Sequence, residues 1–469
     1  MDTEQRFPDI YYEAFNDYKV LSDRARQHLS LNYARPGDLM TSLERMEKAV
    51  TIQLKRNDWF MFGRLNLEKE IRKSLLIFRK RIYQESEVQH RNSKYLDLFL
   101  KAHRFQFRHY RLNGTYSDLD QVLDAIISRI HPPWPGPHPV MDVWIRAKIH
   151  DAASHLPEEI VKNGGIAKIL RAVAGTFLYA LTDLTDETSI KDATGRIDLA
   201  CRAGFYFGYL HPLVDDLLDS SDHLSITEKE EMTGALNYWI GGDFSKNVSA
   251  DASPGLAEIR KALMELYGLF PDFARPMAQK LLYMLHFSQT ADAAHLKSAN
   301  PEWPELYTHA SLKSLLSLMI ADYFSGNFRT GLNEDLMLES GLIMQLTDDL
   351  RDFPDDYTHG VITPFTLYAR FDFKDYPHPW LILMRALDRY IGDNEDSGTI
   401  REILLNNLMI SLKDSILAKD TMVSAKLRGD LKQISLCSFN LISRISARKL
   451  RTDDPEMELF KPIDRFYRQ

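Results

Sequence analysis

Two short acidic motifs, each inside an apolar stretch, constrain this chain more than any other feature. Both have the pattern Asp-Asp-x-x-Asp, one at Asp215–Asp219 and the other at Asp348–Asp352. Residues four apart share one face of a helix, so the outer aspartates of each motif point the same way. Carboxylates on an otherwise buried helix are costly to ionise unless they are paired or bind a cation. Two such helices facing each other would make an oxygen-ligand cage suited to Mg²⁺, whereas two unrelated solvated acid patches are the alternative.

The overall composition is that of an ordinary soluble protein. Apolar residues make up 44% of the 469 residues and charged residues 26%. No run of about 18 apolar residues occurs, so we expect no membrane span, and the first eight residues lack the apolar core of a signal peptide. The two cysteines, Cys201 and Cys437, have no zinc-type spacing and fit a reducing cytosol, so we expect a cytoplasmic protein. A net charge of −8 gives no reason to expect nucleic-acid binding.

A proline-rich stretch separates two parts of the chain. Residues 131–139 contain five prolines, which exclude a helix and predict an extended connector. Residues 1–130 read as a basic helical region, in which Thr51–Arg111 holds 15 Lys and Arg against 6 Asp and Glu. We expect a solvated basic helix face there. Attraction to anionic lipid, as a peripheral membrane contact, or to a diphosphate substrate is the alternative.

From Val140 onward the sequence predicts an all-α bundle. Apolar residues recur at helical spacings, and glycine and proline breakers separate the segments. The expected helices are Ala167–Leu181, Ile197–Leu218, Thr227–Ile240, Gly255–Tyr267, Pro276–Ser288, Ser311–Ser325, Glu334–Phe353, Trp380–Tyr390 and Ile400–Leu417. Long apolar helices of this kind pack as a bundle whose core can carry ligand side chains.

The order and spacing of the motifs resemble those of the class I isoprenoid synthases, especially the trans-polyprenyl diphosphate synthases. The likeness covers residues 164–366, within an expected synthase-like domain of residues 140–469. Lys313-Ser314 is similar to the Lys-Thr pair that supplies a lysine to the diphosphate, and Gln345 precedes the second motif as in the family. Gly164–Arg171 resembles the Gly-Gly-Lys-x-x-Arg-Pro landmark with two extra residues, and Gly360–Pro364 resembles a later landmark without its lysine.

The resemblance implies an all-α isoprenoid synthase bundle in which three Mg²⁺ ions hold an allylic isoprenoid diphosphate. The implied metal ligands are Asp215, Asp216, Asp219, Asp348, Asp349 and Asp352, and the catalytic set is Asp215, Asp219, Asp348 and Lys313. Diphosphate contacts are expected from Lys313, Arg351, Lys168 and Arg171, and pocket lining from Phe207, Leu210, His211 and Gln345. Phe205, Tyr206 and Tyr209 are further candidates for an aromatic wall beside the carbocation, with core packing as the alternative. The family also makes a homodimer an expectation.

The stretch after the first motif departs from the chain-elongating members. Those enzymes place two arginines there to bind isopentenyl diphosphate, whereas this chain has Leu224 and Ser225. A second diphosphate would meet Asp222 and Glu228, which repel it. We therefore favour a terpene synthase-like activity that ionises one allylic diphosphate and releases pyrophosphate. The alternatives are a trans-prenyl diphosphate synthase, a head-to-head synthase of the phytoene and squalene type, and a non-catalytic partner subunit.

Overall fold

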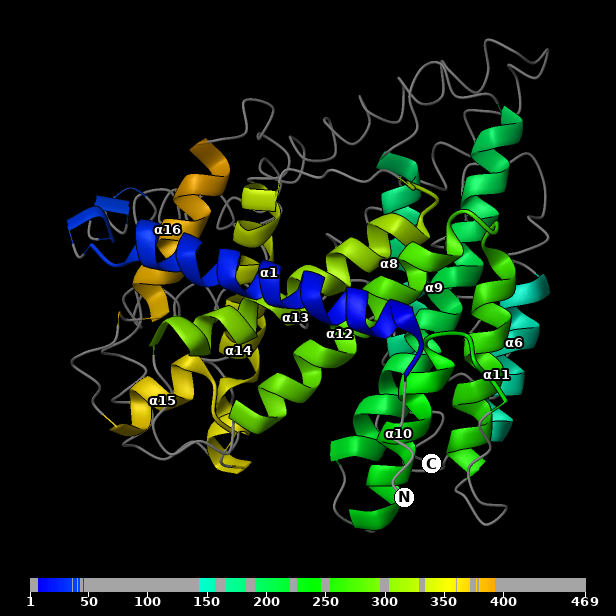
Figure 1. Ribbon diagram of the computed structural model, residues 1–469. Coiled ribbons are helices and arrows are strands. Elements are labelled where there is room, and N and C mark those ends of the chain that lie inside the picture. Colours follow the sequence, from blue (N-terminus) through cyan, green and yellow to red (C-terminus); the bar gives the residue numbers. More distant parts are fainter. Residues whose placement is uncertain are drawn as a thin grey trace, which may run out of the picture.

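The computed structural model describes somewhat more than half of the chain. The described residues are 7–35, 37–39, 41–42, 45, 143–156, 160, 165–182, 190–219, 226–245, 254–295, 303–328, 334–359, 361–371, 377 and 379–392. In this part 88% of the residues are helical and none lies in a strand, so the all-α prediction is confirmed (Figure 1). The particular fold of the isoprenoid synthases stays a prediction. The proline-rich connector, the basic stretch Thr51–Arg111 and the expected helix Ile400–Leu417 lie outside the described residues.

Every helix expected between Ala167 and Tyr390 is present. The described helices are α1 (Asp9–Tyr33), α6 (Ile145–His155), α8 (Gly165–Thr182), α9 (Ile190–Asp219), α10 (Ile226–Trp239), α11 (Pro254–Leu269), α12 (Arg275–His295), α13 (Trp303–Phe324), α14 (Glu334–His359), α15 (Pro364–Phe371) and α16 (Pro379–Gly392). None of the described helices is long and apolar enough to cross a membrane.

Several predicted helix boundaries were wrong. Helix α9 begins at Ile190, seven residues before the expected Ile197, and α12 ends at His295, seven residues after the expected Ser288. Two further errors involve proline. Helix α13 begins at Trp303, eight residues before the expected start at Ser311. Pro304 lies in its first turn, where the missing backbone N–H would have had no partner anyway. Helix α14 continues past Phe353 and through Pro354 to His359. Because Phe353 is fully buried, its packing offsets the backbone hydrogen bond that Pro354 cannot donate.

Among the described helices, α8 and α9 share an extensive contact in which their backbones come close together. A Cβ atom added to Gly208 of α9 would lie 2.6 Å from Cβ of Ala172 in α8, so only glycine allows the backbones to approach this far. One turn earlier, Gly204 lies against Thr176 of α8. The hydroxyl of Thr176 donates to the backbone oxygen of Ala200 at 2.8 Å and joins the two helices by a buried hydrogen bond. Helix α9, which carries the first acidic motif, is therefore fixed by backbone contact.

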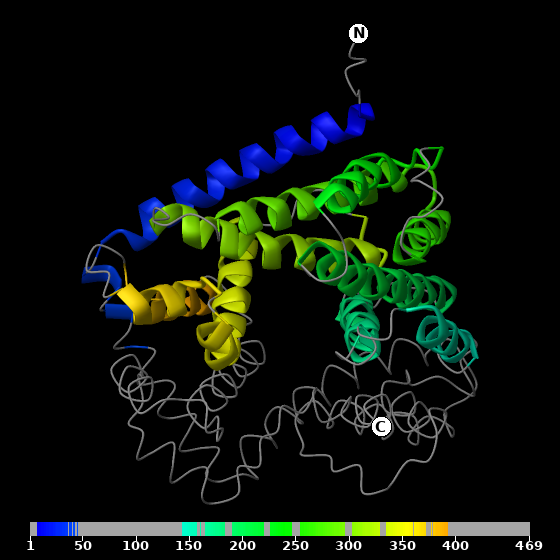
Figure 2. The ribbon, with the colours of Figure 1, turned by 90° about the horizontal axis from the view of Figure 1, so that it is seen from below.

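Helix α12 is enclosed on all sides near its middle, because every residue from Leu281 to Ser288 is buried. Helix α1 packs against α12 and α13 along its length (Figure 2). Tyr11 of α1 makes edge-to-face contacts with Tyr283 and Phe287 of α12, at ring-centroid distances of 5.4 and 5.0 Å. The described beginning of the chain is therefore part of the helical core. The expected domain boundary at residues 131–139 lies outside the described residues.

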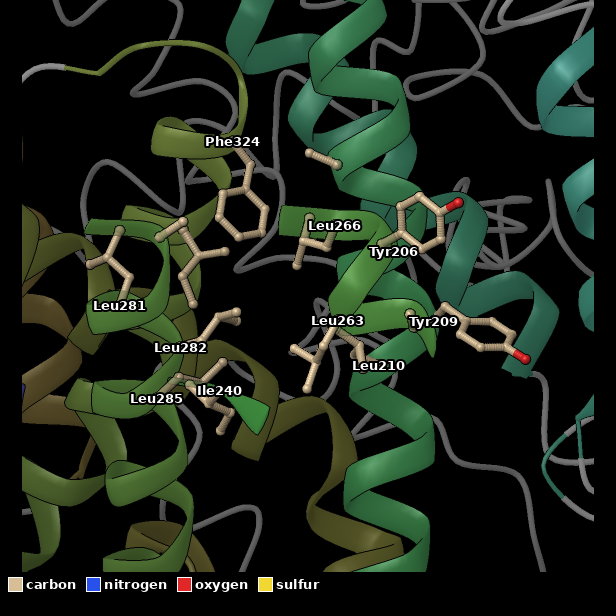
Figure 3. Close-up of a cluster of buried hydrophobic side chains, with 14 of the residues drawn as sticks. Tyr206, Tyr209, Leu210, Ile240, Leu263, Leu266, Leu281, Leu282, Leu285 and Phe324 are labelled. Carbon is tan, nitrogen blue, oxygen red and sulfur yellow. The ribbon is translucent and has the colours of Figure 1, made fainter. Parts of the chain in front are cut away.

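The helices form two groups joined through α12 and α13. Helices α14, α15 and α16 pack together in one group, and α6, α8, α9 and α11 form the other (Figures 1 and 2). Buried apolar side chains of α9, α11, α12 and α13 make a continuous core between them, part of which is drawn in Figure 3. Helix α13 contacts α14 as well as α8 and α9, so it is the element common to both acidic motifs.

Candidate functional site

Helix α13 contacts each motif-bearing helix through a specific pair of side chains. The hydroxyl of Ser314 donates to Oε1 of Gln345 in α14 at 2.7 Å. At the C-terminal end of α13, the ring of Phe324 lies edge-on against Phe207 of α9, with centroids 5.9 Å apart. Ten residues of helix separate Ser314 from Phe324, which corresponds to about 15 Å along the helix axis. The two motif-bearing helices are thus held at separate places on one helix.

The neighbouring aspartates of the second motif have different surroundings. The side chain of Asp348 is exposed, whereas Asp349 is only 6% exposed. Nε2 of Gln345 donates to Oδ1 of Asp349 at 2.8 Å, one turn away on the same helix. Successive residues of a helix point about 100° apart, so α14 turns Asp349 toward its packed side and Asp348 away from it. Exposed Met344 lies one turn before Asp348 on the outward side.

Lys313, the expected diphosphate contact, lies close to this part of α14. It is half-exposed and directly precedes Ser314 on α13. Since Asp348 follows Gln345 by three residues, Lys313 and Asp348 both lie within one helical turn of the Ser314–Gln345 hydrogen bond. A cation and an exposed carboxylate thus flank the contact between α13 and α14.

The first motif occupies the C-terminal end of α9. The backbone of Asp215, Asp216 and Asp219 is helical, and their side chains lie outside the described residues. One turn before the motif, His211 is half-buried and lies edge-on to Phe207 at 6.2 Å. The helix that leads into the motif therefore has its Phe207 and His211 side directed toward α13, where Phe324 lies.

The other aromatic residues of α9 lie toward α6 and α11. The ring of Phe205 is edge-on to Trp144, at 5.4 Å, next to the start of α6. The hydroxyl of Tyr209 donates to Glu258 of α11 at 2.9 Å, and Figure 3 shows the hydroxyls of Tyr206 and Tyr209 pointing away from Phe324. Burial, followed by the Glu258 carboxylate, raises the pKa of Tyr209 above its ordinary value, so the hydroxyl stays a donor. Among the four expected wall residues, Phe207 has a ring contact with α13, through Phe324.

The remaining predicted residues lie in several places. Leu210 is buried in the same apolar cluster as Leu263 of α11. Lys168 is half-exposed in α8. The side chains of Arg171, Arg351 and Asp352 lie outside the described residues, although their backbones are helical. Their roles as pocket, diphosphate or metal residues stay predictions.

The described part of the landmark, residues 361–364, leads into helix α15. The backbone N–H of Thr363 donates to Oγ1 of Thr366 at 2.8 Å, and the N–H of Thr366 donates back to Oγ1 of Thr363 at 3.3 Å. This reciprocal pair is a capping box, and Pro364 follows as the first residue of α15. Helix α15 was not among the helices expected from the sequence, although the Thr-Pro-x-Thr pattern signals a helix start.

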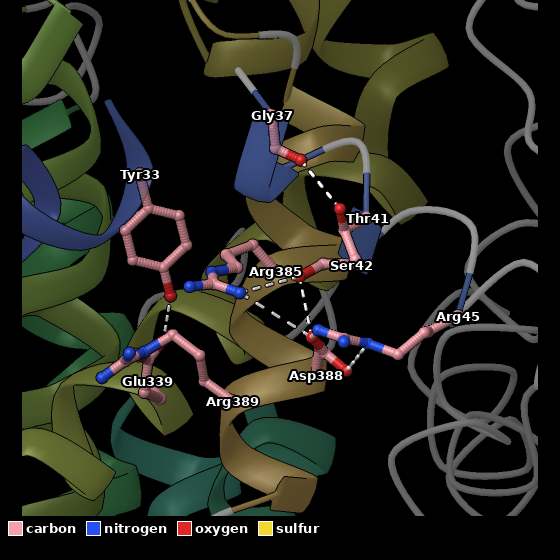
Figure 4. A network of polar contacts seen from close by, with 9 residues as sticks. All are labelled: Tyr33, Gly37, Thr41, Ser42, Arg45, Glu339, Arg385, Asp388 and Arg389. Carbon is pink, nitrogen blue, oxygen red and sulfur yellow. Dashed lines mark hydrogen bonds and ion pairs between the residues drawn. The ribbon is translucent and has the colours of Figure 1, made fainter. Parts of the chain in front are cut away.

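A buried carboxylate that the sequence analysis missed lies nine residues before Asp348. Glu339 is 1% exposed and accepts hydrogen bonds from the hydroxyl of Tyr33, from Nε2 of His28 at 2.8 Å and from Nε of Arg389 at 2.5 Å. These donors come from α1 and α16, and Figure 4 shows part of this network. The sequence signal for this site was a glutamate that lies between Leu338 and the apolar residues after Gly341. A carboxylate buried in such a stretch needs hydrogen-bond donors from other parts of the chain.

The carboxylates of the two acidic motifs are suitable ligands for Mg²⁺, which prefers carboxylate oxygens. Asp348 presents such an oxygen donor at the surface, whereas Asp349 is buried. Within the described side chains, no group of three or more His, Cys, Asp or Glu residues is placed to hold a metal ion. The side chains of four of the six motif aspartates lie outside the described residues, so the metal site stays a prediction.

Comparisons with known proteins yield no relative. No family model, no curated protein and no solved structure matches the chain. The resemblance to the class I isoprenoid synthases therefore rests on the sequence motifs.

Proposed function

We propose that this protein is a Mg²⁺-dependent class I isoprenoid synthase that ionises an allylic prenyl diphosphate and releases pyrophosphate. The observation that carries the proposal is the pair of Asp-Asp-x-x-Asp motifs on α9 and α14, two helices that both pack on α13. Helix α13 also carries Lys313 beside the contact with α14. In the proposed site, the acidic side chains of both motifs and Lys313 would lie around the metal ions and the diphosphate.

The chemistry requires charge stabilisation more than acid–base catalysis. Loss of pyrophosphate from an allylic diphosphate creates negative charge on the leaving group, which Mg²⁺ neutralises when it is bound. Asp215, Asp219 and Asp348 would hold the metal ions, and Lys313 would donate to the diphosphate oxygens. The allylic cation that remains needs an apolar or aromatic wall, for which Phe207 is the candidate on α9.

The absence of the arginine pair after the first motif favours a terpene synthase-like reaction over chain elongation. Leu224 and Ser225 occupy those positions, and neither side chain can form a forked ion pair with a second diphosphate. The cation would then cyclise or lose a proton.

One assay tests the proposal and separates it from its alternatives. The purified protein is incubated with Mg²⁺ and allylic diphosphates of C10 to C25, with and without isopentenyl diphosphate. A hydrocarbon or alcohol formed without isopentenyl diphosphate is the expected result. A longer diphosphate formed only in its presence would replace the proposal by prenyl chain elongation, and condensation of two allylic diphosphates would indicate a head-to-head synthase. No turnover of any substrate would favour a non-catalytic partner subunit.

A further inference from the structure

The side of α14 that faces α13 is fixed at two successive contacts. A Cβ atom on Gly341 would lie 2.7 Å from the backbone oxygen of Ser311 and 2.8 Å from Cβ of Leu315, so the two backbones touch there. One turn later, Gln345 accepts the hydrogen bond of Ser314. Residues 341, 345 and 349 recur every four positions and form one stripe along the helix. Asp349, at the end of this stripe, is the buried aspartate of the motif and accepts a hydrogen bond from Gln345.

Both polar atoms of the Gln345 side-chain amide form hydrogen bonds here. Its oxygen accepts from Ser314 of α13, and its nitrogen donates to Asp349 of α14. A carboxylate acceptor strengthens a hydrogen bond, so Asp349 fixes which way the amide faces. The chain Ser314–Gln345–Asp349 therefore couples the rotation of α14 about its axis to the position of α13.

We propose that Asp349 is a positioning residue that acts through Gln345 and Ser314 to hold α14 in the rotation that presents Asp348 to the metal. The inference rests on the proposed function, because it assigns different roles to two neighbouring aspartates of the same motif. Asp348 needs its charge, since it would contact the cation. Asp349 needs only an acceptor oxygen, which an asparagine also supplies to Nε2 of Gln345.

A matched pair of isosteric substitutions separates the two roles. Binding of Mn²⁺ alone to the full chain is measured by the electron paramagnetic resonance signal of the free ion, which reports on metal affinity without turnover. Asp348→Asn is expected to weaken Mn²⁺ binding by at least about tenfold, because loss even of a group that only supports a ligand costs that much. Asp349→Asn is expected to change the affinity less than about threefold, since the acceptor remains.

Substitutions in the other two members test whether the contact positions Asp348. Ser314→Ala removes the donor and is expected to weaken Mn²⁺ binding about tenfold, whereas Ser314→Thr keeps the hydroxyl and restores it. Gln345→Glu places a carboxylate against Asp349 and is expected to weaken binding at least as much as Ser314→Ala. Helical circular dichroism and thermal unfolding of each variant show whether it folds, and Ser314 is half-exposed, so its variants are mild.

Each outcome decides between the roles. Equal losses in Asp348→Asn and Asp349→Asn would make Asp349 a metal ligand and overturn the positioning role. Wild-type affinity for Mn²⁺ in both Ser314→Ala and Gln345→Glu would also overturn the positioning role. Wild-type protein that binds no Mn²⁺ would reject the proposed function itself, together with this inference, and that result is distinct from the other two.

Discussion

Nε2 of His28 lies 2.8 Å from Oε1 of Glu339 and joins the first helix of the chain to the helix that carries the second acidic motif. The amide nitrogen of Asn32 lies 3.3 Å from the other ring nitrogen of His28 and can only donate to it. Nε2 of His28 therefore carries the proton and donates to Glu339. Tyr33 and Arg389 complete the set, so the buried carboxylate has three donors from two other helices.

Removing the charge of Glu339 is expected to destabilise the protein strongly. Glu339→Gln leaves the guanidinium of Arg389 without its buried counter-charge, which typically costs about 3–5 kcal/mol of unfolding free energy. Urea unfolding followed by circular dichroism measures the loss. Glu305→Gln is the matched control, because Glu305 pairs with exposed Arg26 and such pairs contribute about 1 kcal/mol or less. Equal effects of the two substitutions would contradict the structural role of Glu339.

Replacing a glycine by alanine should change the free energy of unfolding in opposite directions in α10 and in α14. Gly341→Ala forces a Cβ into contact with Ser311 and Leu315 and is expected to cost about 1–3 kcal/mol. Gly234→Ala in α10 meets no atom within 4 Å, so it should stabilise the helix by about 0.5–1 kcal/mol. Thermal unfolding of both variants tests the closeness of α13 and α14. A stabilising Gly341→Ala would show that these helices are further apart.

Stability should fall in acid because of His286. Burial lowers the pKa of His286 to about 4, so the folded protein keeps it neutral while the unfolded chain binds a proton below about pH 6.5. Between pH 6.5 and 4 the unfolded state holds more protons, and stability rises with pH; full titration corresponds to about 3 kcal/mol. Urea unfolding across this range measures the slope. His286→Gln should remove one proton's contribution, and an unchanged slope would place the dependence elsewhere.

Two aromatic residues of α9 should differ in their effect on products. Phe207 lies against Phe324 of α13, whereas Tyr209 is hydrogen-bonded to Glu258 on the α11 side. Phe207→Leu is therefore expected to change the product mixture formed from an allylic diphosphate, and Tyr209→Phe to leave it unchanged. Gas chromatography of the products distinguishes them. A change in the Tyr209→Phe products with none for Phe207→Leu would place the cation on the other side of α9.

Helical periodicity predicted the helices from Ala167 to Tyr390 because their apolar stripes are long and breakers separate them. The prolines in α13 and α14 led to wrong expected boundaries for these helices. The free energy that a proline costs a helix depends on its position in the helix and on the burial of its neighbours. The pattern of the second motif could not distinguish Asp348 from Asp349. Their difference arises from which side of α14 packs on α13, and that is set by Gly341 and Gln345.

The first helix was also hard to place from sequence. Residues 1–130 were expected to be helical, but no pattern in the first helix indicated that His28 and Tyr33 contact a carboxylate more than 300 residues later in the chain. Contacts over such a separation leave no periodic signal. Only the acid at Glu339, inside an apolar stretch of α14, indicated that partners were needed.

Release of pyrophosphate from an allylic diphosphate tests most directly whether this protein ionises its substrate with Mg²⁺ and requires Asp348. We predict release by the wild-type protein with Mg²⁺, none after chelation of the metal, and a rate at least about tenfold lower in Asp348→Asn. Glu305→Gln, which alters only the Glu305–Arg26 pair, should keep the wild-type rate. Release that persists without metal, or an Asp348→Asn variant as fast as the wild-type protein, would contradict the account.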